Sequence, residues 1–338
     1  MGLLRKYQKQ LILFLFINII FSVPLFYRID YRATMPGGLS RVERLIEIDS
    51  NHQTTGSFNT TFVLSFNRIT MFQHLFYTHN SRIEVHQVSP SQSHFTARDH
   101  NIMGQISMNA SIELSIIVAY RYAQKELSYD VLGFILSHHP EGFDLFGLGA
   151  MFTNINGVTG AGIRDVILNA EPDAILNITY TYFYDTSKEY QISIPRSALN
   201  GTAIQIKYGN FVANPTFTVN RSNSGGPSGG LLQTLHNYDI LTGANLTRGL
   251  VIAGTGTINY DGTVGAIGGM RQKIYTAQKN RASIFLVPFS DNQNSSEFRN
   301  FQEALAAYQS LRRPTFVLVP VRNFQEALEA LRNDKNFQ

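Results

Sequence analysis

The sequence predicts an α+β protein with an N-terminal transmembrane helix, a small β-rich module in the middle and an α/β domain at the C-terminus. Three observations carry this prediction. The first is an uncharged apolar stretch at residues 11–27. The second is a run of short strand-like segments between residues 128 and 196, and the third is an alternation of strand-like and helix-like segments after it. With 338 residues, the chain has room for roughly two domains of about 150 residues each.

Composition excludes several functional classes. Lys and Arg number 28 against 24 Asp and Glu, and the basic residues are scattered singly, so nucleic acid is not expected as a partner. The chain has no cysteine, which excludes disulfides, thiolate zinc sites, iron–sulfur clusters and cysteine nucleophiles. We expect neither a metal nor a cofactor.

The apolar stretch at 11–27 predicts contact with a lipid bilayer through an uncleaved signal anchor. Its length is at the lower limit for a helix that crosses a hydrocarbon core of about 30 Å. A cleaved signal peptide is the alternative, but bulky residues at 25–27 stand where a small-residue cleavage site would lie. Three basic residues precede the stretch, and only two arginines with an acid between them follow it closely. The positive-inside rule therefore predicts a single-pass cell-membrane protein whose N-terminus is cytoplasmic and whose remaining chain lies outside.

Four regions are expected along the chain. Residues 1–32 are the cytoplasmic N-terminus and anchor, and residues 33–127 are a β-rich linker region with a strand at 58–66 and a helix at 108–125. Residues 128–196 form the β-rich module, with strands at 131–136, 150–157, 175–184 and 190–194 and a helix at 162–168. Residues 197–338 alternate strands, at 204–208, 216–220, 249–258, 283–288 and 315–320, with helices at 231–241, 271–280, 297–310 and 323–331.

A glycine-rich loop at 224–230 leads directly into an apolar helical segment. Glycines let a ligand approach the backbone, and the N–H groups and positive dipole end of the following helix would stabilise an oxyanion. The loop contains Ser228, a candidate nucleophile. Two alternatives are a phosphate-binding loop and a flexible turn whose serine caps the helix. Leucines follow the last glycine where a P-loop has Lys and Ser or Thr, so nucleotide binding is not expected.

A second segment supplies a candidate base for that serine. Residues 252–273 predict a hairpin that turns at Asp261-Gly262, followed by a Gly268-Gly269 entry into a helix that carries Lys273. His236 lies about 12 Å along the helix after Ser228, too far to reach the hydroxyl. A lysine kept neutral by desolvation can replace histidine as the base.

The stretch from Gly225 to about Pro288 resembles the proteolytic domain of Lon-type serine peptidases. That family carries a Gly-Pro-Ser-Ala-Gly nucleophile loop and a Gly-Gly-x-Lys-x-Lys motif, which appear here at 226–230 and 268–273. The resemblance implies that Ser228 is the nucleophile, that Lys273 is the base and that Thr255 hydrogen-bonds the lysine. It also implies that Gly226, Pro227 and Gly229 form the nucleophile loop and oxyanion site. Gly229 departs from the family alanine, and the acidic residue found before Gly-Pro-Ser in ATP-dependent relatives is absent.

The whole chain resembles the bacterial membrane-anchored subgroup that joins one N-terminal span, a PDZ module and a Lon-type domain. On this resemblance, Leu132, Gly133 and Phe134 represent the carboxylate-binding loop of a PDZ module and would bind peptide. The alternative is that these residues form an ordinary buried strand.

The function expected from the sequence is an ATP-independent, membrane-anchored serine endopeptidase that cleaves extracytoplasmic peptides or proteins with a Ser-Lys dyad. The alternative is a catalytically silent scaffold that binds peptides at the cell surface, and a phosphate-binding ATPase is a more distant third. Retention of both Ser228 and Lys273 favours the enzyme. The sequence leaves the oligomeric state, the physiological substrate and the cleavage-site preference open.

Overall fold

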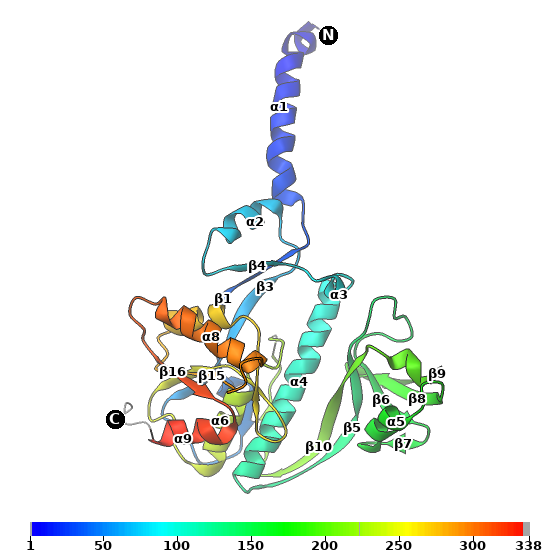
Figure 1. Ribbon diagram of the computed structural model, residues 1–338, viewed down its shortest axis with the longest axis vertical. Helices are drawn as coiled ribbons and strands as arrows, with labels where there is room; N and C mark the ends of the chain where they lie inside the picture. Colours follow the sequence, from blue (N-terminus) through cyan, green and yellow to red (C-terminus); the bar gives the residue numbers. More distant parts are fainter. Residues whose placement is uncertain (1, 223, 334–338) are drawn as a thin grey trace.

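The computed structural model describes residues 2–222 and 224–333. Figure 1 shows helix α1 (Gly2–Phe26) projecting from the rest of the chain, which packs on both sides of the long helix α4 (Ala97–Tyr122). A mixed sheet covered by helices lies on one side of α4, and an antiparallel sheet lies on the other.

Helix α1 carries the expected apolar stretch. Tyr7–Phe26 is long and apolar enough to cross a membrane, and the rest of the protein buries none of its apolar window. Helix α4 meets the same test of length and composition, but most of its apolar window is buried within the fold. Since α4 packs against α6 (Gly230–Thr242) and against strands of the antiparallel sheet, it is a core helix.

Helix α4 begins well before the expected start at residue 108. The Thr96 hydroxyl accepts a hydrogen bond from the Asp99 N–H at 3.2 Å, and the Asp99 carboxylate accepts one from the Thr96 N–H at 2.8 Å. This reciprocal capping box begins the helix at Ala97. The first turn is polar, so apolar spacing alone does not reveal it.

The mixed sheet has the strand order β16-β15-β12-β3-β1-β4, in which β16, β15, β12 and β3 run parallel and β1 is antiparallel to both β3 and β4. Its strands are β1 (Tyr31–Arg41), β3 (Ser57–Phe66), β4 (Glu84–Gln87), β12 (Val251–Gly254), β15 (Ile284–Pro288) and β16 (Val317–Val321). This differs from the expected division at residue 197, because β3 pairs with the edge of β12 and so brings the region 33–127 into the C-terminal sheet.

The side chains of β12 and β15 alternate between two cores, as expected for a sheet covered on both faces. Ile252, Ile284 and Leu286 pack with α4, α6 and α9 (Phe324–Asn333). Ala253 and Phe285 pack with α7 (Met270–Lys279) and α8 (Ser296–Gln309) on the other face. Two helical layers thus hold the carboxyl end of β12 in place.

The antiparallel sheet has the strand order β10-β5-β6-β8-β9, with β7 paired to β6. Its elements are β5 (Glu126–His138), β6 (Ala150–Ile155), β7 (Val158–Thr159), α5 (Gly162–Asn169), β8 (Ile175–Tyr182), β9 (Asp185–Pro195) and β10 (Ala203–Asn214). The expected strands and helix of the module are present, but β10 was expected in the C-terminal region. Pairing along the length of β5 places β10 in this sheet instead.

Short elements complete the chain. They are η1 (Val42–Arg44), β2 (Ile46–Ile48), α2 (Met71–Thr78), α3 (Pro90–Ser93), η2 (Arg196–Leu199), β11 (Phe217–Val219), β13 (Thr257–Ile258) and β14 (Val264–Gly265). The antiparallel pair β13 and β14 confirms the expected hairpin at Asp261-Gly262.

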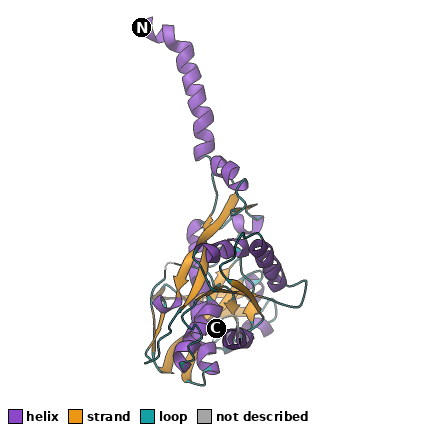
Figure 2. Ribbon diagram, turned by 90° about the vertical axis from the view of Figure 1, so that its left-hand side faces the viewer, coloured by secondary structure: helices purple, strands orange, loops and turns teal. Residues whose placement is uncertain are grey.

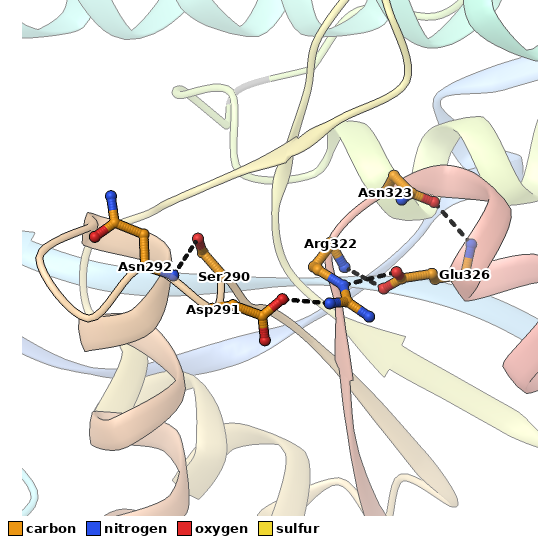
Figure 3. A network of polar contacts seen from close by, with 6 residues as sticks. All are labelled: Ser290, Asp291, Asn292, Arg322, Asn323 and Glu326. Carbon is orange, nitrogen blue, oxygen red and sulfur yellow. Dashed lines mark hydrogen bonds and ion pairs between the residues drawn. The ribbon is translucent and has the colours of Figure 1, made fainter.

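Polar contacts tie the end of the mixed sheet to this hairpin. Arg322, just after β16, forms ion pairs with Asp291 and Glu326 (Figure 3). Its carbonyl accepts a hydrogen bond from the Val264 N–H at 2.9 Å. The Asn323 side chain caps α9 by accepting the Glu326 N–H. Because the ion pairs are exposed, they add little stability, and it is the backbone hydrogen bond from Val264 that attaches β14 to the end of β16.

Candidate active site

Ser228 lies in a loop that is held from both sides. It precedes the N-terminus of α6 by two residues and is half-buried. The Gly226 N–H donates to the Gly104 carbonyl of α4 at 2.7 Å, and the Ser111 hydroxyl of α4 donates to the Pro227 carbonyl at 3.1 Å. These contacts fix the backbone on the N-terminal side of the serine.

Thr255, the residue after β12, holds the loop from the sheet side. Its N–H donates to the Leu286 carbonyl at 3.0 Å and its hydroxyl to the Ser228 carbonyl at 3.1 Å. The next N–H, of Gly256, donates to the same Ser228 carbonyl at 2.9 Å. The nucleophile loop is therefore attached to the carboxyl end of the central strand.

Lys273 reaches this group from the first turn of α7. Its Nζ lies 2.7 Å from the Ser228 Oγ and 2.9 Å from the Thr255 Oγ1. The side chain is 2% exposed. The structure thus brings together the three side chains that the sequence singled out, although Ser228 and Lys273 are 45 residues apart in the chain.

Helix α8 holds the segment that leads to Lys273. The Asn300 side chain accepts the Ile267 N–H at 2.7 Å and donates to the Ile267 carbonyl at 2.9 Å. The Glu297 carboxylate accepts the Ala266 N–H at 3.0 Å. Both backbone groups of Ile267 are therefore satisfied by one buried side chain, which sets the direction in which α7 begins.

Burial changes the charge of the lysine. Loss of water around the amine disfavours its protonated form and lowers the pKa of Lys273 to about 7. A large fraction of the amine is then neutral near neutral pH. A neutral amine 2.7 Å from a hydroxyl can accept its proton, which the protonated form cannot.

The start of α6 offers donors for a developing oxyanion. The Gly226 N–H is already used by Gly104, and Pro227 has no N–H. The N–H groups of Ser228 and Gly229 have no hydrogen-bond partner among the described residues. Together with the positive end of the α6 dipole, they form the favourable place for negative charge in this loop.

A cavity of about 450 Å³ opens beside these loops. Pro227 borders it from the nucleophile loop, Ile267 and Gly268 from the segment before α7, and Asn300 and Glu303 from α8. Within residues 2–222 and 224–333, no group of three His, Asp or Glu side chains could hold a metal ion.

His236 does not take part in this group. Its side chain is 4% exposed, and its ring lies against Phe58, with 6.3 Å between ring centroids. Burial lowers the pKa of His236 to about 4. His236 is therefore a buried, neutral side chain of α6. Its position away from the Ser228 hydroxyl agrees with the distance of about 12 Å expected along the helix.

Leu132, Gly133 and Phe134 lie in β5, and Phe134 has a paired strand on each side. Phe134 pairs with Ile206 of β10 on one side and with Phe152 of β6 on the other. A peptide therefore has no free edge to add to at Phe134. Gly133 serves close packing, because a Cβ there would lie 2.4 Å from the Phe152 carbonyl oxygen. At Phe134 and Gly133 these contacts are those of a buried strand, and peptide binding by Leu132, Gly133 and Phe134 stays a prediction.

Sequence reasoning missed the residues that support the site from other elements. Ser111, Asn300 and Glu297 contact the backbone of the two loops, and none belongs to the motifs around Ser228 or Lys273. No local sequence pattern marks these residues. A side chain that binds a backbone group far away in the chain produces neither a motif nor a hydrophobic periodicity in its own segment.

We compared the chain with known proteins and protein families. A search of curated proteins finds no match to the chain. Residues 187–312 match the family described as Lon protease (S16) C-terminal proteolytic domain, and this segment contains Ser228, Thr255 and Lys273. This segment of the chain is therefore similar to the proteolytic domain of Lon-type serine peptidases.

Proposed function

We propose that the protein is an ATP-independent serine endopeptidase in which Ser228 and Lys273 form a catalytic dyad. The observation that carries the proposal is the 2.7 Å contact between the Ser228 Oγ and the amine of a buried lysine. Thr255 is a positioning residue, because its hydroxyl accepts from the amine and its own proton goes to the Ser228 carbonyl.

The reaction follows from this arrangement. The neutral Lys273 amine takes the hydroxyl proton as the Ser228 oxygen attacks the peptide carbonyl, and the N–H groups of Ser228 and Gly229 stabilise the oxyanion. The protonated amine then gives its proton to the leaving nitrogen, which leaves an acyl ester on Ser228. A water molecule, deprotonated by the same amine, hydrolyses that ester and restores both side chains.

Membrane anchoring and independence from ATP belong to the same proposal. Helix α1 has the length and apolarity of a span, and the charges on either side of it favour a cytoplasmic N-terminus and an extracytoplasmic catalytic domain. The chain has no GxxxxGK[ST] motif, so its own residues offer no P-loop for a nucleotide. Substrates would be peptides or proteins on the outer face of the cell membrane.

A catalytically silent scaffold is the competing function. Burying a lysine without a carboxylate partner costs folding free energy, and a scaffold gains nothing from that cost. The paired edges of β5 at Phe134 also weigh against the scaffold, because a peptide could not join the sheet at that residue.

The test uses the full chain in detergent or lipid discs, with casein cleavage and labelling by a serine-directed fluorophosphonate as readouts. Ser228→Ala and Lys273→Ala should each lower casein cleavage by at least about 10³-fold, and the double variant should be no worse than either single, because the two residues act as a unit. Lys273→Arg should be equally inactive, since guanidinium does not give up its proton.

Lys279 provides the matched control, because it is an exposed lysine on the same helix. Lys279→Arg and Lys279→Ala should keep full activity. If Lys273→Arg retained a tenth of wild-type cleavage in a folded, contaminant-free preparation, the lysine would not be the base and the proposed dyad would be wrong.

A further inference from the structure

Helix α2 (Met71–Thr78) exposes an apolar face. None of its residues is buried. Four apolar side chains at i, i+1, i+4 and i+5 are each at least 44% exposed: Met71, Phe72, Leu75 and Phe76. The Phe72 and Phe76 rings contact each other, with 4.5 Å between centroids. This spacing places all four side chains on one side of the helix.

The opposite side of α2 is fixed to the protein. The His74 ring packs edge-on against Tyr31 of β1, with 4.5 Å between centroids. Thr70 and Gln73 form a capping box that defines the start of the helix. The apolar face is therefore held in a set orientation, and it does not result from a loosely attached segment.

Helix α2 adjoins the end of α1. The Met71 N–H donates to the Tyr27 carbonyl at 3.1 Å, and Arg28 forms a β-bridge with Thr70. Figures 1 and 2 show α2 at the foot of α1, between that helix and the sheets. Phe26, the last residue of α1, is 79% exposed, so apolar side chains continue from the predicted span onto α2.

We propose that α2 is an interfacial helix whose apolar face enters the outer leaflet of the bilayer that α1 spans. This inference rests on the proposed membrane anchor. Continuity of the two apolar surfaces identifies the bilayer as the occupant, because a helix bonded to the last turn of a span lies at the depth of the headgroups. An amphipathic helix binds there through its apolar face.

The charges near α2 fit the same occupant. Arg28 and Arg68 are exposed at the junction between the two helices, and Arg68 also pairs with Asp30 at 3.1 Å. Arginine near the membrane surface favours contact with lipid phosphates. With α1 and α2 both held by lipid, the catalytic domain has two attachment points and a fixed tilt.

The absence of tryptophan from the chain allows a direct measurement of depth. Three variants each introduce a single indole. Leu75→Trp places it on the apolar face of α2, and Phe16→Trp places it in the middle of α1. Val212→Trp places it at an exposed position of β10, opposite Ser128 of β5. The three full-length variants are reconstituted into vesicles of phosphatidylcholine and phosphatidylglycerol, with and without acyl-brominated lipids that quench indole fluorescence.

We expect strong quenching of Phe16→Trp, clear quenching of Leu75→Trp and none of Val212→Trp. If Phe16→Trp is quenched while Leu75→Trp behaves like Val212→Trp, the anchor stands and the interfacial helix is wrong. If Phe16→Trp is not quenched, the proposed anchor itself fails. Fluorophosphonate labelling of Ser228 confirms that each variant is folded. Phe72→Glu with Phe76→Glu, in the Leu75→Trp background, should reduce the quenching at position 75.

Discussion

The chemistry of Lys273 comes from the absence of water around its amine. Burial lowers the pKa of this lysine to about 7, and the protonated form, which dominates below that pH, cannot act as a base. We therefore expect the rate of Ser228 labelling by fluorophosphonate to fall about tenfold for each pH unit below 7 and to level off above about 8. The measurement is a rate series from pH 5.5 to 9. A flat profile would show that no group with this pKa activates the serine.

Gly229 is the position at which this loop departs from the Lon-type pattern, and the structure shows why alanine does not suit it. A Cβ at Gly229 would lie 2.9 Å from the Thr60 methyl group and 3.0 Å from the Gln233 amide. As the N-cap of α6, glycine is also favoured over alanine. Gly229→Ala should lower the free energy of unfolding by about 1 kcal/mol. The variant should also cleave more slowly than the wild type, although alanine is the residue of the Lon-type pattern.

Urea unfolding and casein cleavage measure the two effects of Gly229→Ala. An exposed glycine with open space around it, Gly268, provides the comparison for the stability part. A more stable and faster Gly229→Ala variant would show that the loop relaxes away from Thr60 and Gln233 at no cost.

The sequence singles out Ser228 and Lys273 because each lies in a short glycine-containing motif, and Thr255 through the resemblance to Lon-type peptidases. Ser111 and Asn300 act on the same loops but lie in ordinary helical segments. Their roles depend on how α4 and α8 are placed in three dimensions, so only the structure reveals them.

Helix α4 connects the two sheets to the nucleophile loop. Ser111 contacts the Pro227 carbonyl, and two positions further along the helix the buried Glu113 carboxylate pairs with Lys207 and accepts the Tyr208 N–H of β10. Burial raises the pKa of Glu113 despite the neighbouring lysine. One helix therefore contacts the antiparallel sheet and the catalytic loop within a single turn.

Ser111→Ala tests this element as a positioning device. The loss of one hydrogen bond of about 1 kcal/mol should reduce kcat about fivefold, with little change in KM, because the serine does not contact substrate. Ser111→Thr should restore most of the rate. Asn101→Ala, at an exposed position of the same helix, serves as the control. A rise in KM with kcat unchanged would assign Ser111 to substrate binding instead.

At the scale of the whole molecule, the proposed orientation predicts which parts of the chain a protease can reach. When protease is added to intact cells stripped of their wall, residues beyond about 30 should be digested, and an epitope fused before Gly2 should survive until the membrane is permeabilised. Protection of the whole region beyond residue 30 would reverse the orientation.

Independence from ATP is a separate prediction for the whole molecule. The full chain should cleave casein equally well with and without ATP and magnesium.

The sequence predicts most strands of the two sheets, missing β1, β4 and β7, but not how the strands are assigned to the sheets. Strand β3 belongs with β12 and strand β10 with β5, contrary to the expected divisions at 127 and 196. Secondary structure depends on local periodicity, whereas these pairings join segments far apart in the chain. The Thr61 hydroxyl, for example, donates to the Gly254 carbonyl 193 residues away.

This long-range pairing affects when the active site can form during synthesis of the chain. Strand β12, which ends one residue before Thr255, lies between β3 from the first quarter of the chain and β15 from near its end. Such non-local contacts form late in folding, since a long loop must close first. On the proposed topology, a chain still being translocated would not bring Ser228 and Lys273 together until residues up to Pro288 had emerged. On this proposal, cleavage would begin only after β3, β12 and β15 have paired.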